Sequence, residues 1–156
     1  MALKGVFGDS RRVNFELLRE ACNNYPSLFI DCNNCANPHL MFGIVSDEAL
    51  HNVFVVQAES MYRFSTVLKE LEDIAEQLNV KRIIISTFDR LFNFQNELEN
   101  RMMNQNLWEM IKTISDSGIS TEIITGVNSK SREHMSLAQK YCRVLESWEL
   151  PLQAKG

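Results

Sequence analysis

The sequence predicts an α/β fold of three layers, in which helices cover both faces of a mostly parallel β-sheet. Three short runs, SLFID, NVFVVQ and RIIIS, are rich in β-branched and aromatic residues, as strands buried on both faces are. Longer amphipathic stretches separate these runs, and alternating strands and helices are typical of parallel sheets with right-handed crossovers. An all-helical bundle is the competing interpretation, but the runs are too short and too β-branched for its helices.

The pattern of apolar and polar residues positions the elements along the chain. In chain order, we expect strands over residues 3–7, 27–31, 52–57, 81–86, 119–127 and 142–148, and helices over residues 13–23, 62–78, 94–117 and 131–141. Residues 8–12 are expected to form a turn. An Asn-rich loop with one helical turn at its end fills residues 32–43.

Apolar stripes and end signals support the helices. The first helix ends before the Tyr25-Pro26 pair, because the residue before a proline leaves the α region. The clearest stripe, over residues 62–78, consists of Phe64, Val67, Leu68, Leu71, Ile74, Ala75 and Leu78. The next stripe runs through Phe94, Leu98, Met102, Leu107, Ile111 and Ile114. Gly118 is its expected C-terminal cap, and Ser129 or Ser131 caps the last helix.

Length and composition indicate one soluble domain over residues 1–150, followed by a loose end over residues 151–156. The chain has 156 residues and a net charge of -4, which argues against nucleic-acid binding by the chain alone. No apolar run approaches the roughly 20 residues of a membrane span, and the N-terminus has no secretion signal, so a cytoplasmic location is expected. The four cysteines are expected to be reduced thiols.

Polar residues follow several predicted strands, at the edge where the carboxyl ends of parallel strands meet. Ligands of open parallel sheets bind at that edge, which makes Ser86, Thr87 and Asp89 the first candidates. Asp31 and Glu59 follow two other strands and are a candidate carboxylate pair for metal binding or acid-base chemistry. Polar strand ends without a function are common, and we favour that interpretation for this pair.

Four stretches follow each other in an order that carries a family resemblance: FIDCNNCANPHLM, VFVVQAESMYRFSTVLKELE, RIIISTFDRLF and KYCRVLESW. They resemble four segments of RecA-like recombinase ATPases. The first is similar to a strand that ends in Asp before an Asn- or Gly-rich turn, and the second to a strand followed by a short polar switch and a helix. The third resembles the Walker B strand, and the fourth the final strand of the family. The small archaeal RecA paralogues are the most similar group. The resemblance covers most of the chain as a pattern of segments and implies a RecA-like (P-loop NTPase-type) core.

The nucleotide-binding residues of that family are missing. A P-loop has the order G-x-x-x-x-G-K-[ST], in which backbone N–H groups, the lysine and the hydroxyl hold phosphates and Mg²⁺. Here the turn after the first strand contains Gly8, Asp9 and Ser10, without the second glycine, the lysine or the hydroxyl residue that follows it. Ser86 stands where the Walker B strand has its carboxylate. The resemblance therefore implies a core that has lost ATP binding and hydrolysis, and no cofactor is expected.

One alternative is a nucleotide- or phosphate-binding enzyme with a non-standard crevice at the strand ends. In that enzyme Arg11 or Arg12 holds phosphate at the start of the first helix, and Asp89 replaces the lost acid. The crevice then comprises Gly8, Ser10, Arg11, Arg12, Asp31, Glu59, Ser86 and Asp89. Solvated arginines and a capping Asp89 are the simpler interpretation.

A third hypothesis is a thiol or zinc protein. Cys32 and Cys35 have the C-x-x-C spacing, and His39 follows them, but a closed zinc site needs a fourth ligand. Loop packing of the two cysteines is the simpler interpretation. His134, on the last helix, is expected at the surface.

The leading hypothesis is a non-catalytic module that binds other proteins. The helix over residues 94–117 carries Met103, Trp108 and Met110 outside its apolar stripe, and large Met and Trp side chains are enriched where proteins meet. A wider buried face is the alternative for these three residues. We expect the chain to associate with itself or with a RecA-type or DNA-repair protein.

Overall fold

The structure is a computed structural model, which describes residues 3–92 and 97–148. In this part of the chain, six strands form one sheet in the order β3-β2-β4-β5-β1-β6, and all neighbours are parallel. The strands are β1 (Leu3–Gly8), β2 (Ser27–Asp31), β3 (Val53–Gln57), β4 (Arg82–Ile85), β5 (Glu122–Asn128) and β6 (Val144–Ser147). The helices are α1 (Ser10–Asn23), α2 (Asp47–His51), α3 (Met61–Leu78), α4 (Glu97–Asp116) and α5 (Arg132–Tyr141), with short 3-10 helices η1 (Pro38–Met41) and η2 (Asp89–Phe92).

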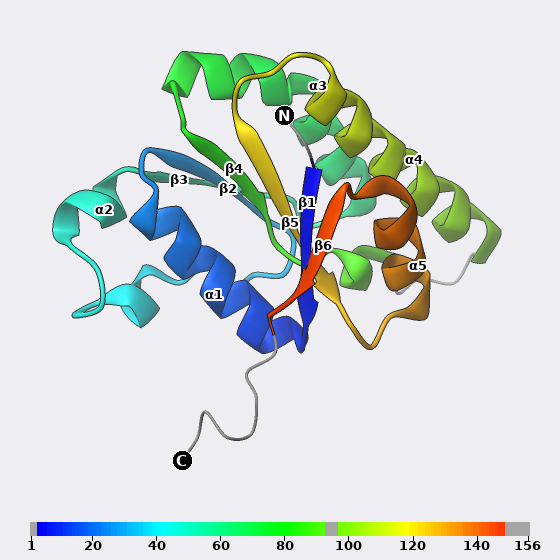
Figure 1. Cartoon of the computed structure of the whole chain (residues 1–156), viewed down its shortest axis with the longest axis horizontal. Helices are drawn as coiled ribbons and strands as arrows, with labels where there is room; N and C mark the ends of the chain where they lie inside the picture. The colour runs from blue at the N-terminus through cyan, green and yellow to red at the C-terminus, as the bar shows by residue number, and fades with distance from the viewer. Residues whose placement is uncertain (1–2, 93–96, 149–156) are drawn as a thin grey trace.

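Helices cover both faces of the sheet, so the predicted three-layer α/β fold is confirmed (Figure 1). Strand β2 shows why the strands have no polar side. Leu28 and Ile30 belong to the apolar core beneath α3, α4 and α5, whereas Phe29, between them, belongs to the core beneath α1 and α2. Successive side chains of a strand point to opposite faces, and here both faces are buried.

Three differences from the predicted elements affect the site. Helix α1 begins at Ser10, because Asp9 is its N-cap and accepts the Arg12 N–H at 3.4 Å, so the turn predicted over residues 8–12 is wrong. The short helix α2 and η2 were not predicted. All strand pairs of the described residues are parallel, in agreement with the mostly parallel sheet that was expected. Phe94 and the loose end over residues 151–156 lie outside the described residues.

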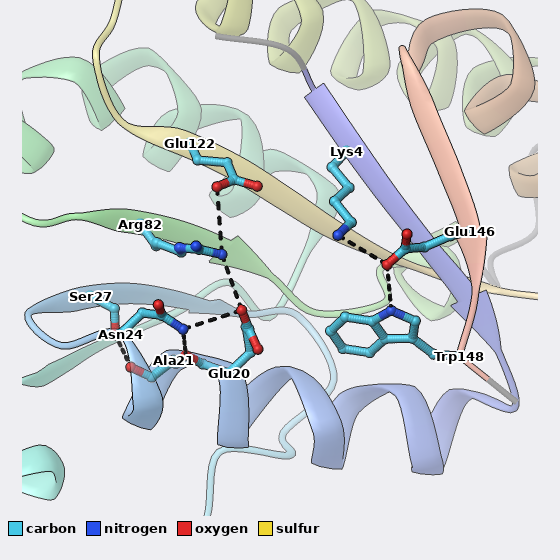
Figure 2. A network of polar contacts seen from close by, with 9 residues as sticks. All are labelled: Lys4, Glu20, Ala21, Asn24, Ser27, Arg82, Glu122, Glu146 and Trp148. Atoms are coloured by element: carbon cyan, nitrogen blue, oxygen red, sulfur yellow. Dashed lines mark hydrogen bonds and ion pairs between the residues drawn. The ribbon is translucent and has the colours of Figure 1, made fainter. Parts of the chain in front are cut away.

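A polar network ties α1 to the amino ends of the strands, opposite the edge where a ligand is expected (Figure 2). The Arg82 guanidinium lies 3.0 Å from the Glu20 carboxylate of α1 and 3.5 Å from the Glu122 carboxylate of β5. The Ser27 hydroxyl, at the start of β2, donates to the Ala21 carbonyl at 2.7 Å. These contacts hold the C-terminal half of α1 against the sheet.

The last strand is held by a second group of contacts in the same view (Figure 2). The Lys4 ammonium of β1 lies 2.9 Å from the Glu146 carboxylate of β6, and the Trp148 indole N–H donates to that carboxylate at 2.9 Å. The Trp148 hydrogen bond, followed by Lys4, lowers the pKa of Glu146. The side chain of Trp148 is thereby fixed beside the core under α1.

Candidate functional site

The connection from β1 to α1 is Asp9 alone, because β1 ends at Gly8 and α1 begins at Ser10. A P-loop would lie at this connection and would wrap several backbone N–H groups around phosphate, which one residue cannot do. Asp9 is exposed, and its carboxylate lies 3.7 Å from the Lys130 ammonium. Its negative charge occupies the helix end that would otherwise attract an anion.

Thr87, two residues after β4, is the centre of a buried hydrogen-bond network at the strand ends. Its hydroxyl accepts bonds from the side-chain amides of Asn14 at 2.9 Å and Asn33 at 2.8 Å, and lies 3.2 Å from the Ser10 hydroxyl. The Asn14 side-chain carbonyl accepts the Thr87 N–H at 2.9 Å. A hydroxyl has two lone pairs and one hydrogen, so Thr87 donates to Ser10 and is fully satisfied. Ser10 and Thr87 are therefore brought together, but to stabilise the fold.

The Asp31 carboxylate, at the end of β2, organises the loop that follows it. It is 3% exposed and accepts the backbone N–H groups of Asn33, Cys35 and Ala36 at 3.0 to 3.1 Å. The Cys35 thiol also donates to it, at 3.3 Å. Asp31 therefore anchors a loop, which agrees with the structural interpretation of this residue.

A cleft of about 340 Å³ lies beside this loop, between the ends of β2 and β3 and the start of η2. Asp31 and the exposed Glu59 both line it, so the predicted carboxylate pair does reach one cleft. Arg90 lines it too, and its guanidinium donates to the backbone and side-chain carbonyls of Asn33 at 3.2 and 3.3 Å. The cleft offers a cation, an exposed carboxylate and amide groups to a small polar molecule.

The other predicted crevice residues do not gather around this cleft. Arg11 is exposed and Arg12 is half-buried on α1, and neither lines the cleft. The Ser86 hydroxyl is buried and accepts the Cys32 N–H at 2.7 Å, which links β4 to the loop after β2. Asp89 is directed elsewhere, and its carboxylate accepts the Asn128 side-chain amide of β5 at 3.0 Å.

The thiols of Cys32 and Cys35 are protonated and therefore weak nucleophiles. Burial, followed by the Asp31 charge, raises the pKa of Cys35 to about 12, and burial raises the pKa of Cys32 well above its ordinary value. Redox-active thiols have lowered pKa values instead. His39 is exposed, with its ring edge-on to Phe42 at 4.9 Å. Within residues 3–92 and 97–148, no three His, Cys, Asp or Glu side chains are placed to hold a metal ion.

The interaction surface predicted on α4 is wrong for Trp108, whose side chain is fully buried. Met103 and Met110 are half-buried and pack against the same core, so the wider buried face is the correct interpretation. The helix instead exposes Leu98 and Met102, which the predicted stripe assigns to the core. Asn104 and Trp108 are among the buried residues of α4, although neither belongs to the predicted stripe.

Sequence reasoning also missed a second polar pocket, of about 230 Å³, between α4, α5 and η2. Asn104, His134 and Asp89 are among the residues that line it. His134 is 3% exposed rather than at the surface, because its ring packs against those of Phe88 and Trp108. The available signal was Asn104, a polar residue one helical turn before Trp108 and so on the same helix face.

No family model and no curated protein matches the chain. None of the helices in the described part of the chain combines the length and the apolar character needed to cross a membrane. The geometry of the strand-end edge is therefore the basis for a functional inference.

Proposed function

We propose that this chain is a non-catalytic RecA-like domain, which has lost ATP binding and hydrolysis and acts by binding other protein chains. The observation that carries the proposal is the single-residue connection between β1 and α1, at Asp9. A triphosphate needs several backbone N–H groups here, whereas the first turn of α1 is capped by the Asp9 carboxylate. On the RecA resemblance, DNA repair or recombination is the expected setting.

The residues after β4 support the loss of catalysis. A nucleotide hydrolase holds Mg²⁺ with a carboxylate near this strand end. Ser86 stands there instead, and its hydroxyl accepts a backbone N–H of the neighbouring loop. Thr87, the next residue, uses its whole hydrogen-bonding capacity within the fold.

Strand β3 offers the surface for association. It is an edge strand of the sheet, and its sequence VFVVQ has neither the proline nor the charges that commonly protect an edge from pairing. Val55, in its middle, is 44% exposed. The opposite edge strand, β6, carries Glu146, which is paired with Lys4. An unprotected edge favours the addition of a further strand, and a second copy of β3 across a two-fold axis supplies one.

The chain segment before α2 carries further exposed apolar side chains. Leu40, Phe42 and Ile44 are 48%, 59% and 52% exposed. They precede α2, which packs beside β3 at the same end of the sheet (Figure 1). Exposed apolar side chains that cluster on a surface mark sites of protein association.

Light scattering coupled to size-exclusion chromatography tests the proposal. The wild-type chain is expected to be a dimer or larger, and Val55→Lys is expected to shift it to monomer, because a lysine on the edge opposes strand pairing. Val144→Lys is the matched control, since Val144 is also 44% exposed but lies on β6. A wild-type chain that stays monomeric at high concentration, or equal behaviour of the two variants, would contradict pairing through β3.

The cleft beside Arg90 favours a second candidate function, the binding of a small phosphate-containing molecule. Of the two carboxylates that line it, Asp31 already accepts three backbone N–H groups, so Glu59 is the one carboxylate among the described lining residues that is free to oppose an anion beside Arg90. The Arg90 guanidinium is exposed at the strand-end edge, where ligands of parallel sheets bind. Under this alternative, Arg90→Ala abolishes phosphate binding measured by calorimetry, and Arg63→Ala, an exposed arginine on α3, leaves it unchanged. Absence of binding to the wild-type chain rejects the alternative.

A further inference from the structure

The polar pocket between α4, α5 and η2 is distinct from both the Arg90 cleft and the β3 edge. It lies at the carboxyl ends of β4 and β5, because Asp89 follows β4 and Asn128 is the last residue of β5. This is the edge at which ligands of parallel sheets bind. We call it the Asn104 pocket, after the residue of α4 that lines it together with Phe92 and His134.

Two residues that line this pocket, and Trp108 beside one of them, have buried polar atoms without partners. In the described part of the chain, four buried side-chain atoms have no hydrogen-bond partner. They are the Nδ2 and Oδ1 atoms of Asn104, the Nε2 atom of His134 and the Nε1 atom of Trp108. Asn104 is 1% exposed and His134 3%, and the rings of His134 and Trp108 are 6.1 Å apart. Folded proteins rarely leave such groups unpaired, and the buried polar groups around Thr87 and Asp31 are all bonded. The missing partners therefore point to a molecule that supplies them.

The charges around the pocket argue against an anion. Asp89 and Glu133 contribute two carboxylates, and Lys130 contributes one ammonium that is also near Asp9. A net negative rim opposes phosphate and other anions. Burial lowers the pKa of His134 to about 4, against the opposing effect of Asp89, so the imidazole adds no positive charge at neutral pH.

We propose that the Asn104 pocket binds a small, uncharged, planar heterocycle that presents a hydrogen-bond donor beside an acceptor, the chemistry of a nucleobase. A primary amide carries one acceptor and two donors side by side, and asparagine pairs with the edge of adenine in this way. Phe92, which also lines the pocket, supplies an aromatic ring for stacking. The pocket thus accepts a base without requiring the phosphates that the β1–α1 connection cannot hold.

Nuclear magnetic resonance of the ¹⁵N-labelled chain tests the proposal with adenine, hypoxanthine, cytosine and uracil as probes. The Trp108 indole and Asn104 amide resonances are expected to shift with at least one base. The Trp148 indole, which donates to Glu146, is an internal control that stays in place, and Trp148→Phe assigns the two indole signals. If no base moves either resonance at millimolar concentration, the pocket holds water only and the proposal is overturned. Equal shifts of both indoles overturn it as well.

A pair of variants locates the binding. Asn104→Leu keeps a similar volume and removes the donor and acceptor, so base affinity is expected to fall at least about tenfold. Asn106→Leu, on the exposed side of the same helix, is expected to bind as the wild type does. Wild-type affinity in Asn104→Leu contradicts the proposal. His134→Gln gives a second test if Asn104→Leu does not fold, because the resonances of Trp108 should then shift less on addition of the same base.

Discussion

The buried Thr87 hydroxyl at the strand-end edge is used to hold the fold together. It joins β4 to α1 through Asn14 and to the loop after β2 through Asn33. Both partners are far away in the chain, at separations of 73 and 54 residues. A residue with all its bonds made inside the protein stabilises the fold and leaves the ligand to other positions.

Replacing Thr87 with valine is expected to lower the free energy of unfolding by about 2 kcal/mol. Valine keeps the shape but removes the acceptor, so the buried amide of Asn14 and the half-buried amide of Asn33 each lose a partner. The matched control is Thr66→Val on α3, where an exposed hydroxyl bonds only to the Tyr62 carbonyl, with an expected change below about 0.5 kcal/mol. Urea denaturation measures both variants, and equal losses would count against the network.

Protonation of His134 is expected to destabilise the fold at mildly acidic pH. Its pKa is lowered to about 4 from the ordinary 6.5 by burial, with Asp89 opposing the shift. Between pH 4 and pH 6.5, His134 of the unfolded chain binds more protons than His134 of the folded chain. The contribution of the neutral ring to stability is therefore complete above pH 6.5 and is lost as the pH falls through 4. The slope from this residue is at most about 1.4 kcal/mol per pH unit.

A proton resonance titration of the imidazole checks this directly. The groups that face His134 or lie at the pocket rim are Asp89, Glu133 and Lys130. A midpoint near pH 4 agrees with a buried neutral ring. A midpoint near 6.5 would show that the ring is hydrated and that the pocket is open.

Helix α1 packs closely against β5 at Gly126. A Cβ atom on Gly126 would lie 2.8 Å from a Leu17 methyl carbon and 3.2 Å from the Thr87 backbone nitrogen. Gly126→Ala is therefore expected to lower the free energy of unfolding by about 2 kcal/mol, because the Thr87 backbone is held by Asn14. Gly5→Ala is the comparison, since its Cβ would meet the far ends of two flexible side chains at 2.8 Å. Thermal unfolding should show the smaller loss for Gly5→Ala, and the reverse order would refute this packing.

Helices α3 and α4 differ in how well the sequence predicted them. The stripe of α3 is buried as expected at Phe64, Leu68 and Leu71. In α4, Leu98 and Met102 are exposed, while Asn104 is buried. A periodic pattern gives the buried face of a helix only while the polar residues stay on the other side. Asn104 is an exception, because it is polar and yet lies on the buried face of α4 at the Asn104 pocket. Such departures from the local pattern are expected at functional or strained sites.

For the molecule as a whole, the alternation of strands and helices was enough to predict three layers. The strand order was not predictable, because the apolar run of β2 reads the same whichever strands lie beside it. That order decides which residues meet. The Arg90 cleft assembles only because β3 and β4 flank β2, and the Asn104 pocket only because α4 and α5 pack together beside η2.

Calorimetric titration of the chain with Mg-ATP and Mg-ADP tests most directly whether the β1–α1 connection can hold a nucleotide. The predicted result is no binding tighter than the millimolar range, because Asp9 alone joins the strand to the helix and its carboxylate caps the first turn. A micromolar dissociation constant for either nucleotide would contradict the account.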